Sequence, residues 1–453
     1  MRQILTCQYH CHINISGYLK SYGAAQSSSA SPGGRNGAML GKDRRWLFAF
    51  LWLAFGVSMQ IAAAQAQELK VALMVFSGDQ RAAFNELSRQ FEKENPGVSV
   101  RWLAYDEDAY KSGIERWLSK NEPADVLYWQ AGERLLQYVR RGFVEPIDDL
   151  WEAQNFDADY TEAIKDIVSW RGRVYAVPYS YYQWGLYYRQ SVFLRLGLQP
   201  PQDWDGLLKM CDDMRKADVA PFTIGTHYHW TSAAWFDYLN LRINGLAFHR
   251  ELTSGIASYT DPRVRSVFEH WKTLLDRDCF IDHKLHREWD WKQSLPLLYR
   301  GRAGMLLMGN FFSSTLPGDL AEDFRFAPFP VINPDLPRYE EAPTDVFLLP
   351  VNSANKELAR RFLAFMGRAD VQAALNDKVG KISTNLRAVH GDDYFIRAGA
   401  QLLQSAAGIS QFFDRDSPKA MADDAVRIFT EFMVVRDVDR TLTALERARE
   451  KHY

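Results

Sequence analysis

Cysteine is scarce in this sequence, and the usual motifs of metal-dependent and nucleophilic catalysis are missing. Only 4 of the 453 residues are cysteine, and none lies in a Cys/His pattern with the spacing of a zinc site. The sequence contains no G-x-S-x-G, P-loop or H-E-x-x-H motif. His227 and His229 form an H-x-H pair, but no third ligand is evident. We therefore expect no metal, no cofactor and no catalytic residue.

The sequence also lacks an excess of positive or of negative residues. The chain carries 54 Lys and Arg residues against 56 Asp and Glu residues, which gives a formal net charge of -2 at pH 7. Nucleic-acid-binding domains are normally basic, so we expect no nucleic-acid partner. Aromatic residues, in contrast, are abundant, with 14 Trp, 21 Tyr and 27 Phe. Most Phe residues belong in a core, whereas the surplus of Trp and Tyr suits a site that stacks on a ligand.

The first 66 residues read as a processing signal rather than as part of the fold. Residues 1–38 are polar and rich in Ser and Gly, so we expect them to be disordered or to lie upstream of a true start at Met39. A short basic segment then precedes the apolar run Trp46–Ile61, which is shorter than the about 20 residues of a membrane span. An A-x-A cleavage motif ends at Ala66. We predict a signal peptide over residues 39–66 and export to the periplasm, with an uncleaved anchor as the alternative.

Cleavage at that point leaves two cysteines, Cys211 and Cys279. In an exported protein, two cysteines can form one disulfide. Cys211 lies in a predicted helix among Leu207, Leu208 and Met214, which is equally consistent with a buried free thiol. The sequence leaves both possibilities open.

Strands and helices alternate over the first part of the mature chain. Apolar alternation indicates strands, and apolar residues at helical spacing indicate helices. The predicted strands are Leu69–Phe76, Val98–Leu103 and Ala124–Trp129, and the predicted helices are Gln80–Asn95, Ala109–Leu118 and Leu135–Arg141. This order predicts an α/β lobe with a largely parallel sheet, whose ligands would bind beyond the carboxyl ends of the strands.

The stretch Gly172–Trp204 has the pattern of a connection from this lobe to a second one. The extended run Val174–Val177 enters a proline, and after a polar, aromatic segment a second extended run follows at Gly185–Tyr188. Such a segment can carry the chain between two lobes and line the space between them. Further helices are predicted at Pro201–Lys216, Thr231–Asn244, Pro262–Asp276, Trp289–Arg300, Lys356–Gly367 and Val371–Asn376, and further strands at Pro221–Gly225, Ala303–Met308, Phe324–Pro330 and Thr344–Leu349.

Several segments occur in the order and spacing of a known family. They include FEKENPGVSV (Phe91–Val100), PADVLYW (Pro123–Trp129), RRGFVEPIDDL (Arg140–Leu150), RGRAGMLLMGNF (Arg300–Phe311) and SANKELARRFLAFMGRADVQ (Ser353–Gln372). Over essentially the whole mature chain, the sequence resembles the bacterial extracellular solute-binding proteins of ABC importers. Within them it resembles the large sugar-binding family that includes maltose-binding proteins.

The resemblance implies an α/β, two-lobed periplasmic-binding-protein fold of type II. Hinge crossings would join the lobes, the ligand cleft would lie between them, and ligand would close the hinge. The N-terminal lobe would comprise residues 67–178 with 346–382, and the C-terminal lobe residues 179–345 with 383–453. The crossings are expected at Val177–Tyr181, at Pro343–Phe347 and near Ile382–Asn385.

The same resemblance implies the substrate-binding component of an ABC transporter. Such a protein captures a carbohydrate, either a mono- or an oligosaccharide, and delivers it to the permease subunits in the membrane; we expect a monomer. A binding protein that serves a membrane receptor, or one for a non-sugar solute, is the alternative. A glycosidase would need two paired carboxylates. Nothing in the sequence pairs Asp79, Asp125, Asp237 and Asp345, so we do not expect an enzyme.

A sugar presents hydroxyls around an apolar ring face, so its site needs aromatic platforms and polar groups at the rim. Loops at strand ends and crossings supply the candidates. They are Trp230, His229, Asn310 and Phe311 in the second lobe, Tyr182, Gln183 and Trp184 after the first crossing, Asp345 at the return crossing, and Asp79, Trp129 and Gln130 at strand ends of the first lobe; Trp235 and Lys381 are further candidates. Many relatives carry tryptophans just after the first strand, where this chain has Phe76-Ser77-Gly78-Asp79. The resemblance therefore does not identify a particular sugar as the ligand.

Overall fold

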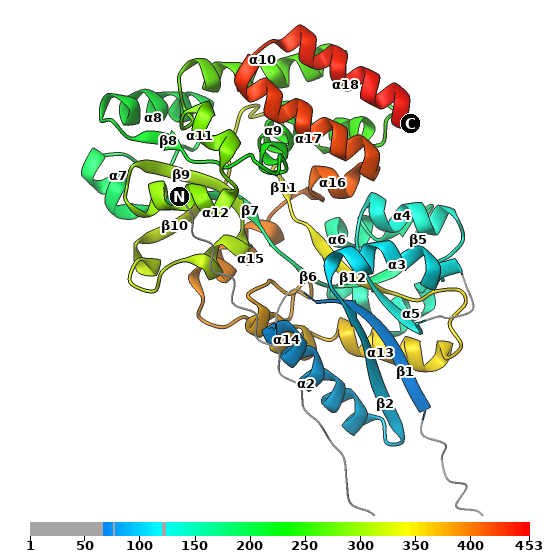
Figure 1. The fold of residues 1–453 in the computed structure, drawn as a ribbon. Helices are drawn as coiled ribbons and strands as arrows, with labels where there is room; N and C mark the ends of the chain where they lie inside the picture. Colours follow the sequence, from blue (N-terminus) through cyan, green and yellow to red (C-terminus); the bar gives the residue numbers. More distant parts are fainter. Residues whose placement is uncertain (1–66, 76–77, 120–123) are drawn as a thin grey trace, which may run out of the picture. The chain divides into compact units, whose positions relative to one another are not determined.

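The computed structural model describes residues 67–75, 78–119 and 124–453 (Figure 1). These residues all belong to one compact unit, Ala64–Tyr453. The predicted signal peptide, the segment before it and the end of the first predicted strand at Phe76 lie outside the described residues. Within the described part, no helix has both the length and the apolar character needed to cross a membrane.

The first sheet of the described chain has the strand order β2-β1-β3-β12-β6. Its strands are β1 (Gln67–Met74), β2 (Val98–Tyr105), β3 (Val126–Gln130), β6 (Ala176–Tyr181) and β12 (Thr344–Leu348). β1 runs parallel to β2 and β3, whereas β12 runs antiparallel to β3 and β6. The predicted, largely parallel sheet is therefore confirmed, with one reversed strand that returns from the second half of the chain.

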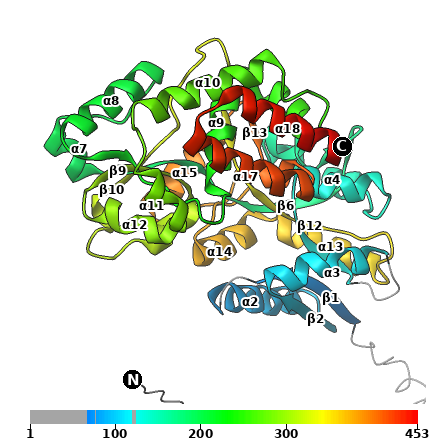
Figure 2. The ribbon, with the colours of Figure 1, turned by 45° about the horizontal axis from the view of Figure 1, so that its top comes forward.

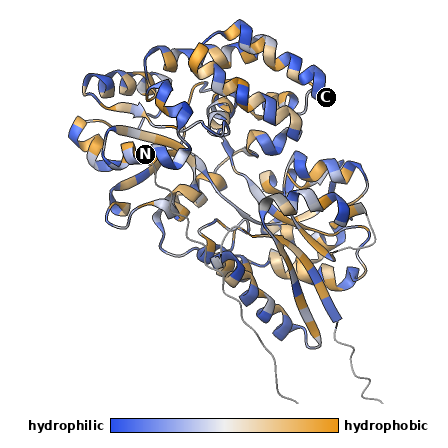
Figure 3. Cartoon of the chain, in the orientation of Figure 1, coloured by the Kyte–Doolittle hydropathy of each residue, from blue (hydrophilic) through white to orange (hydrophobic). Residues whose placement is uncertain are grey.

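Helices cover this sheet (Figures 1 and 2), and their apolar residues pack in one core with those of the strands. The principal ones are α2 (Gly78–Glu94), α3 (Glu107–Ser119), α4 (Glu133–Arg140), α13 (Lys356–Gly367) and α14 (Ala369–Val379). Phe91 of α2 meets Phe362 and Phe365 of α13 with ring centroids 5.2 and 5.3 Å apart. Figure 3 shows the mixed hydrophilic and hydrophobic stretches along the helices, as the helical spacing of apolar residues predicts.

The second sheet has the order β10-β7-β9-β8. Its strands are β7 (Trp184–Arg189), β8 (Ala220–Phe222), β9 (Ala303–Gly309) and β10 (Phe324–Ala327). The helices of this part are α7 (Gln190–Leu196), α8 (Trp204–Lys216), α9 (Thr231–Thr253), α10 (Pro262–Asp276), α11 (His283–Glu288), α12 (Trp291–Tyr299), α15 (Tyr394–Gln404), α16 (Phe413–Asp416), α17 (Lys419–Val435) and α18 (Val438–His452). We call the parts built around the two sheets the first lobe and the second lobe.

Short elements complete the two lobes. They are the helices α5 (Asp148–Ala153) and α6 (Glu162–Asp166), the 3₁₀ helices η1 (Phe156–Ala158), η2 (Asn310–Thr315) and η3 (Ala321–Asp323), and the paired strands β4 (Ser169–Trp170) with β5 (Arg173–Val174) and β11 (Tyr339–Glu341) with β13 (Gly408–Ser410).

Helix α9 runs beyond its predicted end at Asn244. The next residue, Gly245, has φ 81°, and a helix commonly stops where glycine adopts this conformation. Here the chain kinks and continues as a helix to Thr253, because the second part buries Phe248, His249 and Leu252. The burial of that apolar face, which only the tertiary structure provides, outweighs the local stop signal.

The chain changes sheets at Tyr182 and Gln183, between the end of β6 and the start of β7. The boundary drawn from the sequence at residue 178 falls inside β6, three residues before that strand ends. Ile382 then returns to Tyr181, and the two residues exchange backbone hydrogen bonds of 3.0 Å in both directions. The first crossing is therefore held in place by a third segment of the chain.

Cys211 and Cys279 form a disulfide, which decides between the two possibilities that the sequence left open. Cys211 lies in α8, and Cys279 lies just after α10. Their Cα atoms are 5.3 Å apart, and both side chains are buried. The bond joins α8 to the segment that follows α10, and the two cysteines are 68 residues apart in the chain.

Candidate ligand-binding cleft

A cavity of about 640 Å³ is lined by residues of both lobes. Sites for small molecules commonly enclose about 300–1,000 Å³. The first lobe contributes Lys111, Tyr128, Gln130, Asp345, Val379, Gly380 and Lys381; Tyr182 lies at the crossing; and the second lobe contributes Trp184, Trp230, Trp291, Lys292, Asn310, Phe311, Ser314, Thr315, Phe412, Asp414 and Arg415. The cavity therefore lies where a ligand would contact both lobes at once.

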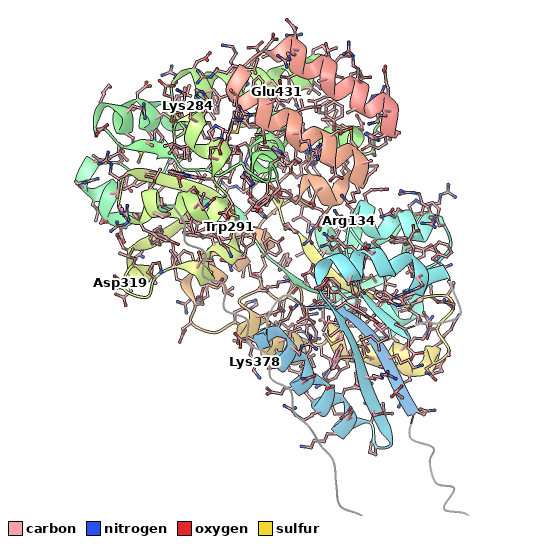
Figure 4. All side chains as sticks on the ribbon, viewed as in Figure 1. Arg134, Lys284, Trp291, Asp319, Lys378 and Glu431 are labelled. Carbon is pink, nitrogen blue, oxygen red and sulfur yellow. A yellow bond between two sulfur atoms is a disulfide. The ribbon has the colours of Figure 1, made fainter. Side chains whose placement is uncertain are left out.

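Aromatic rings of the second lobe form one wall of the cavity. The Trp184 ring stacks on Phe412 with centroids 4.7 Å apart and meets Trp230 edge to face at 6.1 Å. Phe311 lies 5.5 Å from Trp291 and 6.2 Å from Trp230. Trp230 and Trp291 are half-buried and Phe311 is 37% exposed, so ring surface remains available to a ligand. Trp291 is labelled in Figure 4, at the start of α12.

Local sequence sets the positions of these rings. β9 ends at Gly309, and the chain turns into η2, which carries Asn310 and Phe311. A Cβ atom at Gly309 would lie 2.6 Å from the Phe311 ring and 3.0 Å from the Trp184 ring, so any larger residue would displace both aromatic groups. Trp230 directly precedes α9, after a turn in which His229 has φ 66°.

Strand register brings the polar groups of the first lobe together. In the antiparallel pair of β12 and β3, Asp345 lies opposite Gln130, and paired residues face the same side of a sheet. Tyr128, two residues before Gln130, faces that side too and donates a hydrogen bond of 2.9 Å from its hydroxyl to Asp345. Asp345, Gln130 and Tyr128 thus form a polar floor at the end of the sheet.

Asp345 is buried and holds two cations. Its carboxylate accepts a hydrogen bond from Lys381 and one of 3.4 Å from Arg415. Burial by itself would raise the pKa of Asp345, but the charges of Lys381 and Arg415 and the hydrogen bonds from Lys381 and Tyr128 outweigh it and lower the pKa. The carboxylate is therefore ionised at neutral pH and fixes both cations at the cavity.

Two buried polar atoms of cavity residues have no hydrogen-bond partner among the described residues. They are the side-chain oxygen Oε1 of Gln130, an acceptor, and the indole Nε1 of Trp184, a donor. A buried polar group without a partner costs about 1–3 kcal/mol, so a ligand that supplies the partner gains affinity. The cavity thus offers one acceptor and one donor beside an aromatic wall.

The structure brings seven of the eleven sequence-predicted site residues to this cavity. They are Trp230, Asp345, Asn310, Phe311, Gln130, Tyr182 and Trp184, and the further candidate Lys381 joins them. Asn310 already has partners of its own, because its amide oxygen accepts from Gln183 and Tyr187 and its amide nitrogen donates to the Gly380 carbonyl at 3.2 Å. Its side chain ties the lobes together beside the cavity.

The other four residues do not line the cavity. Trp129 points to the opposite face of β3 from Tyr128 and Gln130, because strand residues alternate. There its indole donates to the Arg134 carbonyl at 2.7 Å and its ring lies against Tyr138. The same alternation, read in the sequence, separates Trp129 from Gln130 and singles out Tyr128, which sequence reasoning missed.

Gln183, His229 and Asp79 have other surroundings. Gln183 is fully buried, and its amide donates to Asn310 and to the Phe395 carbonyl of α15, so it anchors the crossing rather than facing the cavity. His229 occupies the turn before α9. Asp79 is exposed in the first turn of α2. The further candidate Trp235 is buried in the second-lobe core.

Arg415, Trp291, Lys111 and Lys292 reach the cavity without a local signal in the sequence. Arg415 comes from α16 and donates to Tyr182 as well as to Asp345. Among the described residues, no cluster of three His, Cys, Asp or Glu side chains could hold a metal ion.

Comparison with known proteins agrees with this geometry. A family model described as bacterial extracellular solute-binding protein matches residues 77–373. An uncharacterized ABC transporter extracellular-binding protein of Pyrococcus horikoshii is 24% identical over 406 residues, which cover 85% of this chain and 88% of that protein. Both similarities extend over most of the chain and through both lobes.

Solved structures show the same fold. The bacterial solute receptor AcbH, with an exclusive substrate preference for β-D-galactopyranose, matches with a TM-score of 0.78 and 25% identity, covering 85% of this chain and 98% of that chain. A chitin oligosaccharide binding protein matches with a TM-score of 0.69 and 16% identity over 85% of this chain and 98% of its own. The predicted two-lobed, type II periplasmic-binding-protein fold is confirmed.

Proposed function

The chain belongs to the bacterial extracellular solute-binding proteins of ABC transporters, and from this premise we propose that it captures a carbohydrate between its two lobes. The ligand would then be delivered to the membrane subunits of a permease. A protein of an extracellular family is secreted or periplasmic, and we propose the periplasm, reached through the predicted signal peptide over residues 39–66. Its action as a monomer stays a prediction.

The residues that line the cavity are the main support for a carbohydrate ligand. An aromatic wall that includes Trp230 and Phe311 suits the apolar face of a sugar ring. The unpartnered acceptor of Gln130 and donor of Trp184 suit hydroxyl groups, each of which can both donate and accept. AcbH and the chitin oligosaccharide binding protein, two structures with the same fold, are named for sugar ligands and support the same class here.

Binding would work through the hinge rather than through chemistry. A ligand that touches the Gln130 side and the Trp230 side has more contacts when the lobes are close, so it shifts the population toward that arrangement. The size of the shift depends on the difference in affinity between the two states. No bond in the ligand need form or break, in keeping with a family of binding receptors.

A ligand screen tests the proposal. Purified protein is heated with single mono- and oligosaccharides, and hits are measured by isothermal titration calorimetry. Because ligand that binds only the folded state stabilises it by about 2.7 kcal/mol at 100 times its Kd, a cognate sugar raises the melting temperature. Amino acids, peptides and polyamines are screened in parallel. Binding of one of these, with no sugar bound, would refute the carbohydrate assignment.

A further inference from the structure

Cations outnumber carboxylates around the cavity. Four lining residues are Lys or Arg, namely Lys111, Lys292, Lys381 and Arg415, and two are acidic, Asp345 and Asp414. Their formal charges, four positive and two negative, sum to +2, whereas the whole chain has a formal net charge of -2. The net formal charge of the lining residues therefore differs in sign from that of the whole chain.

Two of these cations, Lys381 and Arg415, contact the buried carboxylate of Asp345. One oxygen of its carboxylate accepts from Tyr128 and Arg415, and the other accepts from Lys381. Asp345 therefore has little capacity left for sugar hydroxyls, and its main effect is to position two cations. Two cations and one carboxylate leave one positive charge in a largely buried place, where uncompensated charge is costly.

Asp414 compensates that charge only in part, because its carboxylate raises the pKa of Arg415 by its charge but forms its ion pair with another residue. Arg134 of the first lobe, labelled in Figure 4, donates two hydrogen bonds of 3.0 and 2.7 Å to the Asp414 carbonyl and lies 3.2 Å from its carboxylate. The charge of Asp414 is thus shared with a cation that does not line the cavity. Lys381 and Arg415 keep an excess charge beside the aromatic wall.

We propose that the ligand is an acidic carbohydrate, with a carboxylate that docks against Lys381 and Arg415 while its sugar ring lies on the aromatic wall. This proposal rests on the proposed function. A single carboxylate supplies the one negative charge that Asp345 leaves unmatched, whereas a phosphate group carries about -1.5 to -2. The planar guanidinium of Arg415 also matches a carboxylate with two parallel hydrogen bonds.

Matched pairs of sugars test the proposal in the unmodified protein. Calorimetry compares D-galacturonate with D-galactose and D-glucuronate with D-glucose, together with the corresponding disaccharides, at low and at high salt. We expect the acidic member of the recognised pair to bind at least tenfold more tightly at low salt, with a smaller ratio at high salt. Equal or tighter binding of the neutral member would overturn the proposal and leave the sugar-binding function intact.

Two further outcomes separate the proposals. Tighter binding of the matching sugar phosphate than of the uronate would overturn the proposal that the anionic group of the ligand is a carboxylate. Failure of every sugar, with binding of a non-sugar solute, would overturn both this inference and the proposed function.

A variant and its control test whether Lys381 supplies the positive charge that binds the ligand carboxylate. Lys381→Met should reduce the preference for the acidic sugar over its neutral partner at least fivefold. Lys378→Met is the matched control, because this lysine is nearby in α14, pairs with Glu86 and does not line the cavity. An unchanged preference in Lys381→Met would overturn the assignment of Lys381 to the ligand carboxylate. If that variant fails to fold, the comparison of acidic and neutral sugars in the wild type still decides whether the ligand is acidic.

Discussion

At the scale of single residues, alternation along β3 decides what a ligand can reach. Tyr128 and Gln130 face the cavity, whereas Trp129 between them lies against Tyr138 on the other side of the strand. Sequence reasoning placed Trp129 and Gln130 together in the site, although a strand cannot present neighbours on one face. Trp230 and Phe311 lie in loops at the ends of elements, where the alternation of side chains along a strand does not apply. Both line the cavity, as the sequence predicts.

Trp230→Ala should weaken sugar binding by about 1–3 kcal/mol, the range for a lost aromatic contact with its buried area. Its ring is half-buried and meets Trp184, Phe311 and Phe412, so truncation opens the aromatic wall. Calorimetry with the sugar found in the screen measures the change. Trp204→Ala, a half-buried tryptophan of α8 outside the cavity, is the control and should keep wild-type affinity. Unchanged affinity in Trp230→Ala would remove this residue from the site.

At the scale of elements, α8 and α10 form a unit of the second lobe that the disulfide closes. Cys211 lies on the buried side of α8, and Cys279 follows α10, where it donates its backbone N–H to the Leu274 carbonyl. The sequence predicts both helices, and α10 has the predicted bounds, Pro262–Asp276. The sequence leaves the pairing open, because only the packed helices show that the two Cα atoms lie 5.3 Å apart.

Loss of the disulfide should lower the free energy of unfolding by about 2–4 kcal/mol, since the bond closes a long loop in the unfolded chain. Denaturant unfolding curves of the wild type, with and without dithiothreitol, measure this difference. The double variant Cys211→Ala, Cys279→Ala should unfold at lower denaturant and show no response to the reductant. Sugar affinity should not change, because neither residue lines the cavity. A wild type that ignores the reductant under unfolding conditions would contradict the prediction.

At the scale of the whole molecule, a buried carboxyl lies just before the return to the first lobe. Glu341 ends β11, three residues before β12 begins, and neither of its carboxyl oxygens has a partner among the described residues. Burial raises the pKa of Glu341 well above its ordinary value, and the charges of Asp237 and Asp416 raise it further. The folded protein therefore holds this proton to a higher pH than the unfolded chain does.

Stability should accordingly fall as pH rises above the unfolded pKa of Glu341. Below that pKa both states hold the proton; above it only the folded state does, so folding loses up to about 1.4 kcal/mol per pH unit. Glu341→Gln removes this dependence, so its melting temperature relative to wild type should be higher at pH 8 than at pH 5. Glu431→Gln, at an exposed position of α17 labelled in Figure 4, is the control and should follow wild type. Parallel pH profiles for wild type and Glu341→Gln would disprove the prediction.

The amino-acid sequence predicts the alternation of strands and helices, the two lobes and the loops that carry Trp230, Asn310 and Phe311. These follow from local periodicity and from the order of segments, which neighbouring residues encode. Only the folded chain explains the continuation of α9 past Gly245, the pairing of Cys211 with Cys279 and the position of Arg415 beside Asp345. Each of these depends on contacts between segments far apart in the chain, and no local pattern records such distances.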